Sequence, residues 1–242
     1  MKNRRPFERL IAFVGSPYGA LLIVLVAMLF VYPFLGSHRA FNWVFDLITL
    51  GVVAAALRVT DRGQTRYHAI WLLGVSAFIS GFLARSLGLD WAYPLGAGLR
   101  VLFLGYLMVV IFSDILRRKN VTFDAVLGAS CVLVMLGLTF GSGYALLEWL
   151  VPGSFAIPAV PQAIETAFGT SSTESQLVYF SLVAMTTIGF GDIVPLAPPA
   201  RSLVAIEGLL AQLYLAIIIA RLVGLEIASR LQNPEPPGGS SS

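Results

Sequence analysis

The sequence predicts an all-α membrane protein with six transmembrane helices and one shorter helix that enters the membrane without crossing it. Of its 242 residues, 57% are hydrophobic and 12% are charged, whereas charged residues make up about a quarter of a soluble domain. Apolar segments long enough to cross a bilayer recur along the chain. Between a short apolar segment and the last long one lies a glycine-rich stretch, residues 186–192.

The amino-terminal segment, residues 1–16, carries four basic side chains ahead of the first apolar run. Four apolar residues within it fall at helical spacing on one face. The segment is therefore either an amphipathic helix at the membrane interface or a disordered basic tail. At the other end, residues 231–242 are rich in Pro, Gly and Ser, and we expect them to be disordered.

Six apolar runs are interpreted as membrane spans from their length and hydrophobicity. They are, approximately, Pro17–Leu35, Trp43–Val59, His68–Leu89, Leu99–Leu116, Phe123–Trp149 and Ala200–Ser229. The first four form a peripheral unit, residues 17–119, and the last two belong to a second unit, residues 120–230. Residues 90–98 contain a proline and two glycines and are predicted to form a loop.

The distribution of Lys and Arg predicts how the chain lies in the membrane. Basic clusters at residues 2–9, 58–66 and 117–119 alternate with loops that carry few positive charges. Such clusters stay on the cytoplasmic side. We therefore expect a multi-pass protein of the plasma or inner membrane with both termini in the cytoplasm, which places Asp192 on the outer side.

The fifth span has clear boundaries. Thr122 can cap it and Asp124 lies in its first turn, where the helix dipole favours a negative charge. Pro152 ends it. The outer loop that follows, residues 151–172, contains a candidate short helix at Ala163–Phe168.

A short helix is predicted next, running to about Thr186. The tetrad Thr173-Glu174-Ser175-Gln176 has the pattern of a capping box, with Thr173 as the N-cap. Roughly thirteen residues make a helix of about 20 Å, which is too short to cross ~30 Å of hydrocarbon. We therefore expect a re-entrant helix whose carboxyl end points into the membrane and offers negative potential to a cation there.

Two glycines alternate with large apolar residues in the stretch Thr187-Ile188-Gly189-Phe190-Gly191-Asp192. Glycine adopts φ > 0 without steric cost, and a backbone that alternates ordinary and mirror-image torsions turns successive carbonyls to one side. A symmetric ring of such carbonyls can replace the hydration shell of a potassium ion. The predicted ligands are the carbonyls of Thr187, Ile188, Gly189 and Phe190, with Asp192 as an acidic collar at the outer mouth.

These residues resemble the potassium channel family, whose signature is Thr-Val-Gly-Tyr-Gly-Asp. Ile188 and Phe190 are the two departures, and Phe190 lacks the tyrosine hydroxyl. The likeness covers the pore half, about Val121–Ala228, and the Arg-Ser-Leu…Glu…Gln-Leu-Tyr-Leu-Ala run from Arg201 to Ala216 looks like bacterial six-helix channels. It implies a tetrameric cation channel architecture with potassium as the permeant ion and no cofactor. One signature per chain, with no internal repeat, predicts a homotetramer.

Many relatives carry a glutamate four residues before the filter threonine, where this chain has Val183. Glu207 is an ionisable residue inside the last span, and we expect it either to brace the filter by bonding near Thr186 or to be a capped structural carboxyl. The resemblance also places three residues along the inner cavity: Gln212, Leu215 and Ile219.

The resemblance makes residues 120–230 a pore domain of outer helix, pore helix, filter and inner helix, and residues 17–119 a four-helix sensor-like domain that lacks the sensor arginines. Voltage sensing is not expected, because a sensor needs about three or four mobile charges in each subunit and the fourth span has one basic residue, Arg100. Asp46, Arg85 and Arg100 are expected to form a static cluster near the outer ends of their spans. The sequence therefore predicts a passive potassium channel with no enzyme motif, no nucleic-acid partner and no soluble ligand-binding domain. A weakly selective cation channel and a potassium transporter are the alternatives, although such transporters carry four pore-like repeats in one chain.

Overall fold

The computed structural model describes residues 16–31, 39–59, 65–87, 91–117, 122–163, 166 and 172–232. The predictions for residues 1–15, for the tail beyond Gln232 and for most of the candidate helix Ala163–Phe168 lie outside these ranges. The described elements are, in chain order, α2 (Pro17–Val31), α3 (Arg39–Val59), α4 (Thr65–Leu87), α5 (Ala92–Arg117), α6 (Phe123–Leu150), β1 (Phe155–Ala156), α8 (Thr173–Met185), β2 (Val194–Pro195) and α9 (Pro198–Gln232).

Four of the described helices, α4, α5, α6 and α9, are long and apolar enough to cross a membrane. The 15 residues of α2 and the Leu47–Arg58 part of α3 are shorter apolar helices. The multi-pass membrane character is therefore supported, and the count of six spans stays a prediction.

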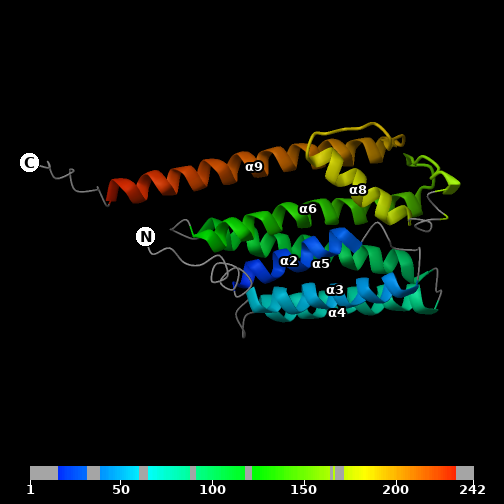
Figure 1. Cartoon of the computed structure of the whole chain (residues 1–242), viewed down its shortest axis with the longest axis horizontal. Coiled ribbons are helices and arrows are strands. Elements are labelled where there is room, and N and C mark those ends of the chain that lie inside the picture. The colour runs from blue at the N-terminus through cyan, green and yellow to red at the C-terminus, as the bar shows by residue number, and fades with distance from the viewer. Residues whose placement is uncertain are drawn as a thin grey trace, which may run out of the picture.

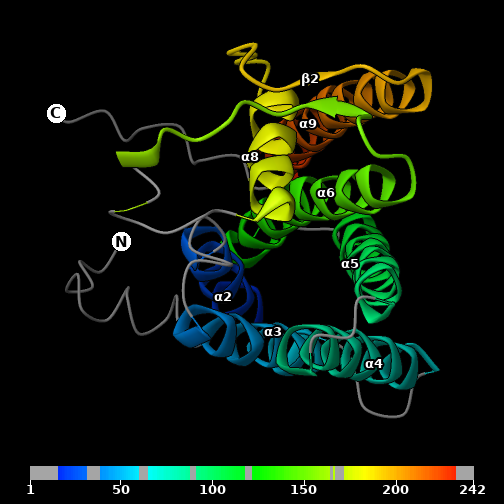
Figure 2. The same ribbon diagram turned by 90° about the vertical axis from the view of Figure 1, so that its right-hand side faces the viewer.

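Consecutive long helices run in alternate directions along one common axis (Figure 1). Helices α2 to α5 lie on one side of α6, whereas α8 and α9 lie on its other side (Figure 2). Helix α6 packs against both α2 and α5 and against α8 and α9. The larger core lies mainly between α6 and the first four helices, and its fully or nearly fully buried side chains include Leu21, Val53, Ile70, Leu107 and Cys131.

Basic residues gather at one end of this bundle. Arg58 lies in the last turn of α3, Arg66 near the start of α4 and Arg117 at the end of α5. These helix ends lie opposite the end that carries β1 and β2 (Figure 1). Residues from two of the three basic clusters thus lie at the same end of the described bundle, and the orientation in the membrane stays a prediction.

The helix caps agree with the sequence in one case and correct it in another. Thr122 caps α6 as predicted, since its hydroxyl oxygen accepts from the backbone N–H of Ala125 at 3.2 Å. The cap of α8 is Ser172, which accepts from the N–H of Ser175 at 3.2 Å. The predicted N-cap at Thr173 is therefore wrong by one residue, because Ser172, just before it, supplies an equivalent hydroxyl at the same three-residue spacing.

The loop predicted at residues 90–98 is wrong from Ala92 onward, where α5 begins. Pro94 lies in the first turn, where a helix has no use for the backbone N–H that proline lacks, so it does not break the helix. Gly96 lies where α5 approaches α4 closely, since an added Cβ would lie 3.3 Å from the backbone nitrogen of Gly81. The proline and the two glycines that suggested a loop therefore all lie inside a helix.

Candidate functional site

Helix α8 slants inward from the end of the molecule that carries β1 and β2, and the glycine-rich stretch leads the chain back to that end (Figure 1). The φ angles are positive at Thr187 (62°), Gly189 (58°) and Gly191 (77°). Within the single chain the side chains of this stretch are exposed, Ile188 to 57% and Phe190 to 68%. The predicted alternation of ordinary and positive φ angles is thus present, and the first positive φ is at Thr187, before either glycine.

The backbone N–H groups of this stretch point back toward α8. Both Ile188 and Gly189 donate to the carbonyl oxygen of Val183, at 3.1 and 3.4 Å. That carbonyl belongs to the last turn of α8, which has no later helical N–H to accept from. Because a trans peptide is planar, its C=O points opposite to its N–H. The carbonyls of Thr187 and Ile188 therefore both point away from α8, toward the same side of the chain.

Backbone torsion, and not crowding, explains the glycines. A Cβ added at Gly189 or Gly191 would meet nothing within 4 Å in the single chain. Positive φ nevertheless disfavours a side chain, because it brings Cβ too close to the following carbonyl oxygen. Thr187 holds such a torsion without being glycine, at a cost of roughly 1–3 kcal/mol. Strain of this size persists where surrounding bonds determine the conformation, as those to α8 do here.

Asp192 is tied to α8 by a side chain that the sequence analysis did not single out. The hydroxyl of Tyr179 donates to Oδ2 of Asp192 at 2.9 Å. The bond holds the outer end of the glycine-rich stretch against the middle of α8.

Glu207 is completely buried in α9 and accepts two hydrogen bonds. The hydroxyl of Tyr144, on α6, donates to its Oε2 at 2.5 Å. The hydroxyl of Ser181, on α8, contacts its Oε1 and also lies 2.8 Å from the carbonyl oxygen of Gly137. One carboxyl thereby joins the three helices α6, α8 and α9.

The partner expected for Glu207 near Thr186 is not the one that the structure shows. Ser181 lies five residues earlier, in the middle of α8, and the Thr186 hydroxyl donates to the carbonyl of Leu182 in its own helix at 2.6 Å. Glu207 points this way because its face of α9 is the one that packs on α6 and α8. The carboxyl therefore holds the body of α8 and does not touch the helix end that leads into the glycine-rich stretch.

The outer loop, whose role the sequence left open, supports the same region. Its strand β1 pairs antiparallel with β2, which follows the glycine-rich stretch. Phe155 of β1 packs against the rings of Tyr144 and Phe180, with centroids 5.2 and 5.7 Å apart. Glu148, near the end of α6, accepts from the N–H groups of Gly153 and Phe155 at 2.8 and 3.0 Å. The returning chain is thus fixed to the end of α6.

The three predicted cavity residues share one face of α9, because they are spaced by three and four positions. Gln212 and Ile219 are exposed in the single chain, and Leu215 is half-buried. A different face carries Ala211 and Ile218, which are buried in the packing of α9. This arrangement is compatible with a cavity lining, which remains a prediction.

Arg100 forms a buried ion pair with Glu174, in the first turn of α8. Its Nη1 lies 2.5 Å from Oε1 of Glu174, and the two side chains are only 8% and 7% exposed. The pair joins the peripheral unit to α8, a link that the sequence analysis did not foresee. The side chains of Asp46 and Arg85 lie outside the described residues, so their place beside Arg100 stays a prediction.

Sequence reasoning missed four partners: Tyr144, Glu174, Tyr179 and Ser181. Each is a polar side chain, and three of them lie in α8 while Tyr144 lies in α6. The available signal was general, since a buried hydroxyl or carboxylate in an apolar region needs a hydrogen-bond partner. The identity of that partner depends on how the helices are rotated against one another.

Comparison with known families adds independent support. A family model described as "Ion channel" matches residues 132–225, from within α6 to near the end of α9. The matched range contains α8, the glycine-rich stretch and the buried carboxyl of Glu207. Comparisons with curated proteins and with solved structures found no match. Residues 132–225 of this chain are thus similar to the ion channel family, in the class of two-helix pore domains that occurs in potassium channels.

Proposed function

We propose that this ion channel conducts potassium passively across the membrane through a filter formed by residues 187–191 of four copies of the chain. The observation that carries the proposal is the backbone of this stretch. Positive φ alternates with ordinary φ, and two successive N–H groups bind the Val183 carbonyl. The carbonyls of Thr187 to Phe190 would then replace the hydration shell of the ion, and Asp192 would stand at the outer mouth.

A homotetramer follows from the need to close a ring. Each chain has one such stretch, so four copies around an axis are required for a full set of ligands. Ile188 and Phe190 are large apolar side chains left exposed in one chain, and neighbouring copies would cover them. A solubilised protein mass near four times 26.1 kDa is expected. A stable monomer or dimer as the only species would count against this arrangement.

The orientation proposed for the channel rests on charge. Arg58, Arg66 and Arg117 lie at the end of the bundle opposite the filter stretch, and basic ends stay in the cytoplasm. The filter mouth would then face outward, with both termini inside. Helix α5 carries Arg100 in a buried pair with Glu174, so we expect conduction to depend only weakly on membrane potential.

The test is a recording from purified protein in planar bilayers under opposed potassium and sodium gradients. The reversal potential of the wild type should follow potassium. Gly189→Ala should lose selectivity or conduction, because a Cβ at positive φ costs about 1–2 kcal/mol in each of the four chains. Gly143→Ala is the matched control, since its added Cβ also meets nothing within 4 Å and its φ is not positive.

Two results would change the proposal. Normal potassium-over-sodium permeability in Gly189→Ala would remove the filter assignment. Equal permeability of the wild type to both ions would favour a weakly selective cation pore instead. The lack of a hydroxyl on Phe190 would then be the expected cause of the low selectivity.

A further inference from the structure

Helix α8, which leads into the filter stretch, is held in its first turn, in its middle and in its last turn. The buried pair of Arg100 and Glu174 holds the first turn. The hydroxyl of Ser181 contacts Glu207 near the middle, and the carbonyl of Val183 in the last turn binds the filter backbone. Of these contacts, the first comes from the peripheral unit, and it has no place in the proposed ion path.

Arg100 reaches α8 past a third helix. Helices α5 and α8 lie on opposite sides of α6 (Figure 2), and among the described residues α8 packs mainly on α6 and α9. The guanidinium nevertheless meets Oε1 of Glu174 at 2.5 Å. Glu174 comes directly before Ser175 and Gln176, whose N–H groups bind Ser172 at the start of the helix. The contact therefore acts on the point where α8 begins.

A buried ion pair is a poor source of stability. The cost of taking two charges out of water often exceeds their mutual attraction, and apolar residues of similar volume frequently give equal or greater stability. A charged pair does fix position, because its two charges are satisfied only where they meet. The pair of Arg100 and Glu174 is therefore better suited to setting the position of α8 than to stabilising the fold.

The position of the first turn bears on the filter stretch because α8 is short. Ser181 lies seven residues after Glu174 and five before the cap Thr186, which is about 10 and 8 Å along the helix. A rigid helix that pivots about Ser181 moves its two ends by similar distances in opposite directions. A shift of the first turn would therefore displace the end of α8 that leads into Thr187.

We propose that Arg100 is a positioning residue for the ion filter. From the peripheral unit it fixes the start of α8 through Glu174, and through the length of α8 it sets where the carbonyls of the filter stretch lie. This inference rests on the proposed channel function, because it gives Arg100 a part in keeping the filter conductive. It assigns the peripheral unit a role in conduction that needs no movement of charge across the membrane.

The test separates position from stability with one double variant. Arg100→Met combined with Glu174→Leu replaces the pair by apolar side chains of similar size, so the unfolding temperature should stay near that of the wild type or rise. The current at constant voltage and low external potassium should nevertheless decay roughly tenfold faster, the effect of losing about one hydrogen bond on the path to decay. The backbone N–H groups of Ser175 and Gln176 should also exchange faster with deuterium, whether or not the protein conducts.

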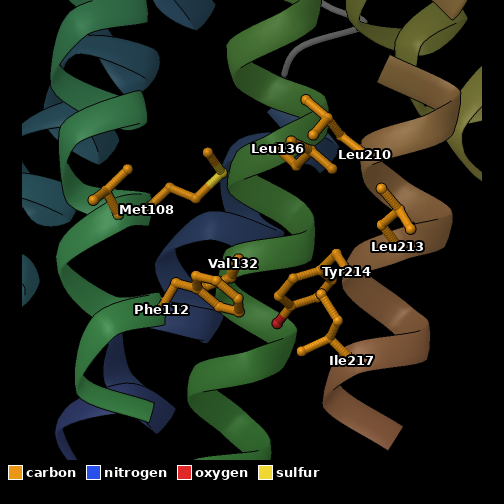
Figure 3. Close-up of a pocket in the computed structure, with 9 residues that line it drawn as sticks. Met108, Phe112, Val132, Leu136, Leu210, Leu213, Tyr214 and Ile217 are labelled. Atoms are coloured by element: carbon orange, nitrogen blue, oxygen red, sulfur yellow. The ribbon is translucent and has the colours of Figure 1, made fainter. Parts of the chain in front are cut away.

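The matched control lies on the same helix. Phe112 follows Arg100 by 12 residues, or about 18 Å along α5, and its ring meets that of Tyr214 on α9 at a centroid distance of 5.7 Å (Figure 3). The Tyr214 hydroxyl donates to the carbonyl oxygen of Ala129 on α6 at 2.6 Å. This contact joins α5 to α9 and α6 and does not include α8. Phe112→Leu should therefore lower the unfolding temperature and leave the decay rate unchanged.

Decay at the wild-type rate in the double variant would overturn the proposal. An equal acceleration in Phe112→Leu would also overturn it, because decay would then follow stability and not the position of α8. If the double variant does not fold, Glu174→Asp keeps the charge pair and shortens its reach by one methylene group; its decay should be faster than that of the wild type, and an unchanged rate would count against the positioning role. A wild type that does not select potassium would refute the proposed function, whereas unchanged hydrogen exchange in the first turn of α8 would refute this inference by itself.

Discussion

Replacing Glu207 by leucine would remove the carboxyl that joins α6, α8 and α9 while keeping a side chain of similar size. The two donors would be affected differently. Ser181 can turn its hydroxyl to the carbonyl of Gly137, which it already approaches to 2.8 Å. Tyr144, which is completely buried, would lose the acceptor that the structure shows for it.

The expected loss of unfolding free energy in Glu207→Leu follows from this difference between the two donors. A buried donor left without a partner costs roughly 1–3 kcal/mol, and here one such donor is created in each chain. Glu207→Gln should cost much less, because the amide oxygen can accept from the Tyr144 hydroxyl and the amide N–H can donate to the Ser181 oxygen, whose own hydroxyl turns to the carbonyl of Gly137. Glu207→Leu combined with Tyr144→Phe should recover much of the loss, because both polar partners are then absent.

Two measurements check this reasoning. Unfolding of the solubilised protein should show Glu207→Leu destabilised, Glu207→Gln near the wild type and the double variant more stable than the sum of its single changes, with a coupling of about 1 kcal/mol or more. Current at constant voltage and low external potassium should decay faster in Glu207→Leu, because α8 carries the filter stretch. If the lost stability lowers the barrier to current decay by about 1.4 kcal/mol, the decay rate rises roughly tenfold.

The reasoning would be refuted by strictly additive single and double variants, since Glu207 and Tyr144 would then not act as a bonded pair. Unchanged decay in Glu207→Leu, with reduced stability, would mean that the carboxyl holds the fold together without supporting the filter. These two outcomes are separable because stability and decay are measured on the same proteins.

Two further predictions come from contacts between α8 and its neighbours. Arg100→Gln should lower the unfolding temperature, since removing one partner of a buried pair costs up to roughly 3–5 kcal/mol, and adding Glu174→Gln should restore stability. The slope of conductance against voltage should stay unchanged in Arg100→Gln; a flattened slope would mean that α5 senses voltage. Gly141→Ala should destabilise the protein strongly, because its Cβ would lie 2.6 Å from the Val178 Cα, whereas Gly143→Ala meets nothing within 4 Å; equal unfolding temperatures for the two variants would contradict the close packing of α6 on α8.

Much of the candidate site could be predicted because its determinants are local in the sequence. The length of α8 sets it apart from the spanning helices, and two glycines two positions apart permit the alternating torsions that the structure shows at Gly189 and Gly191. The cap at Thr122 needs only a hydroxyl three residues before a free N–H. Each of these features involves a few consecutive residues, so no knowledge of the packing was needed.

The side-chain partners were decided by tertiary structure. Glu207 meets Tyr144, 63 residues away, and Arg100 meets Glu174, 74 residues away. In a soluble helix an apolar stripe would show which face packs inward. A helix in a membrane is apolar on nearly every side, so its sequence does not show which face meets which neighbour. Close packing sets that rotation, as at Gly141 against Val178, and the rotation in turn brings Glu207 to the middle of α8 and not to Thr186.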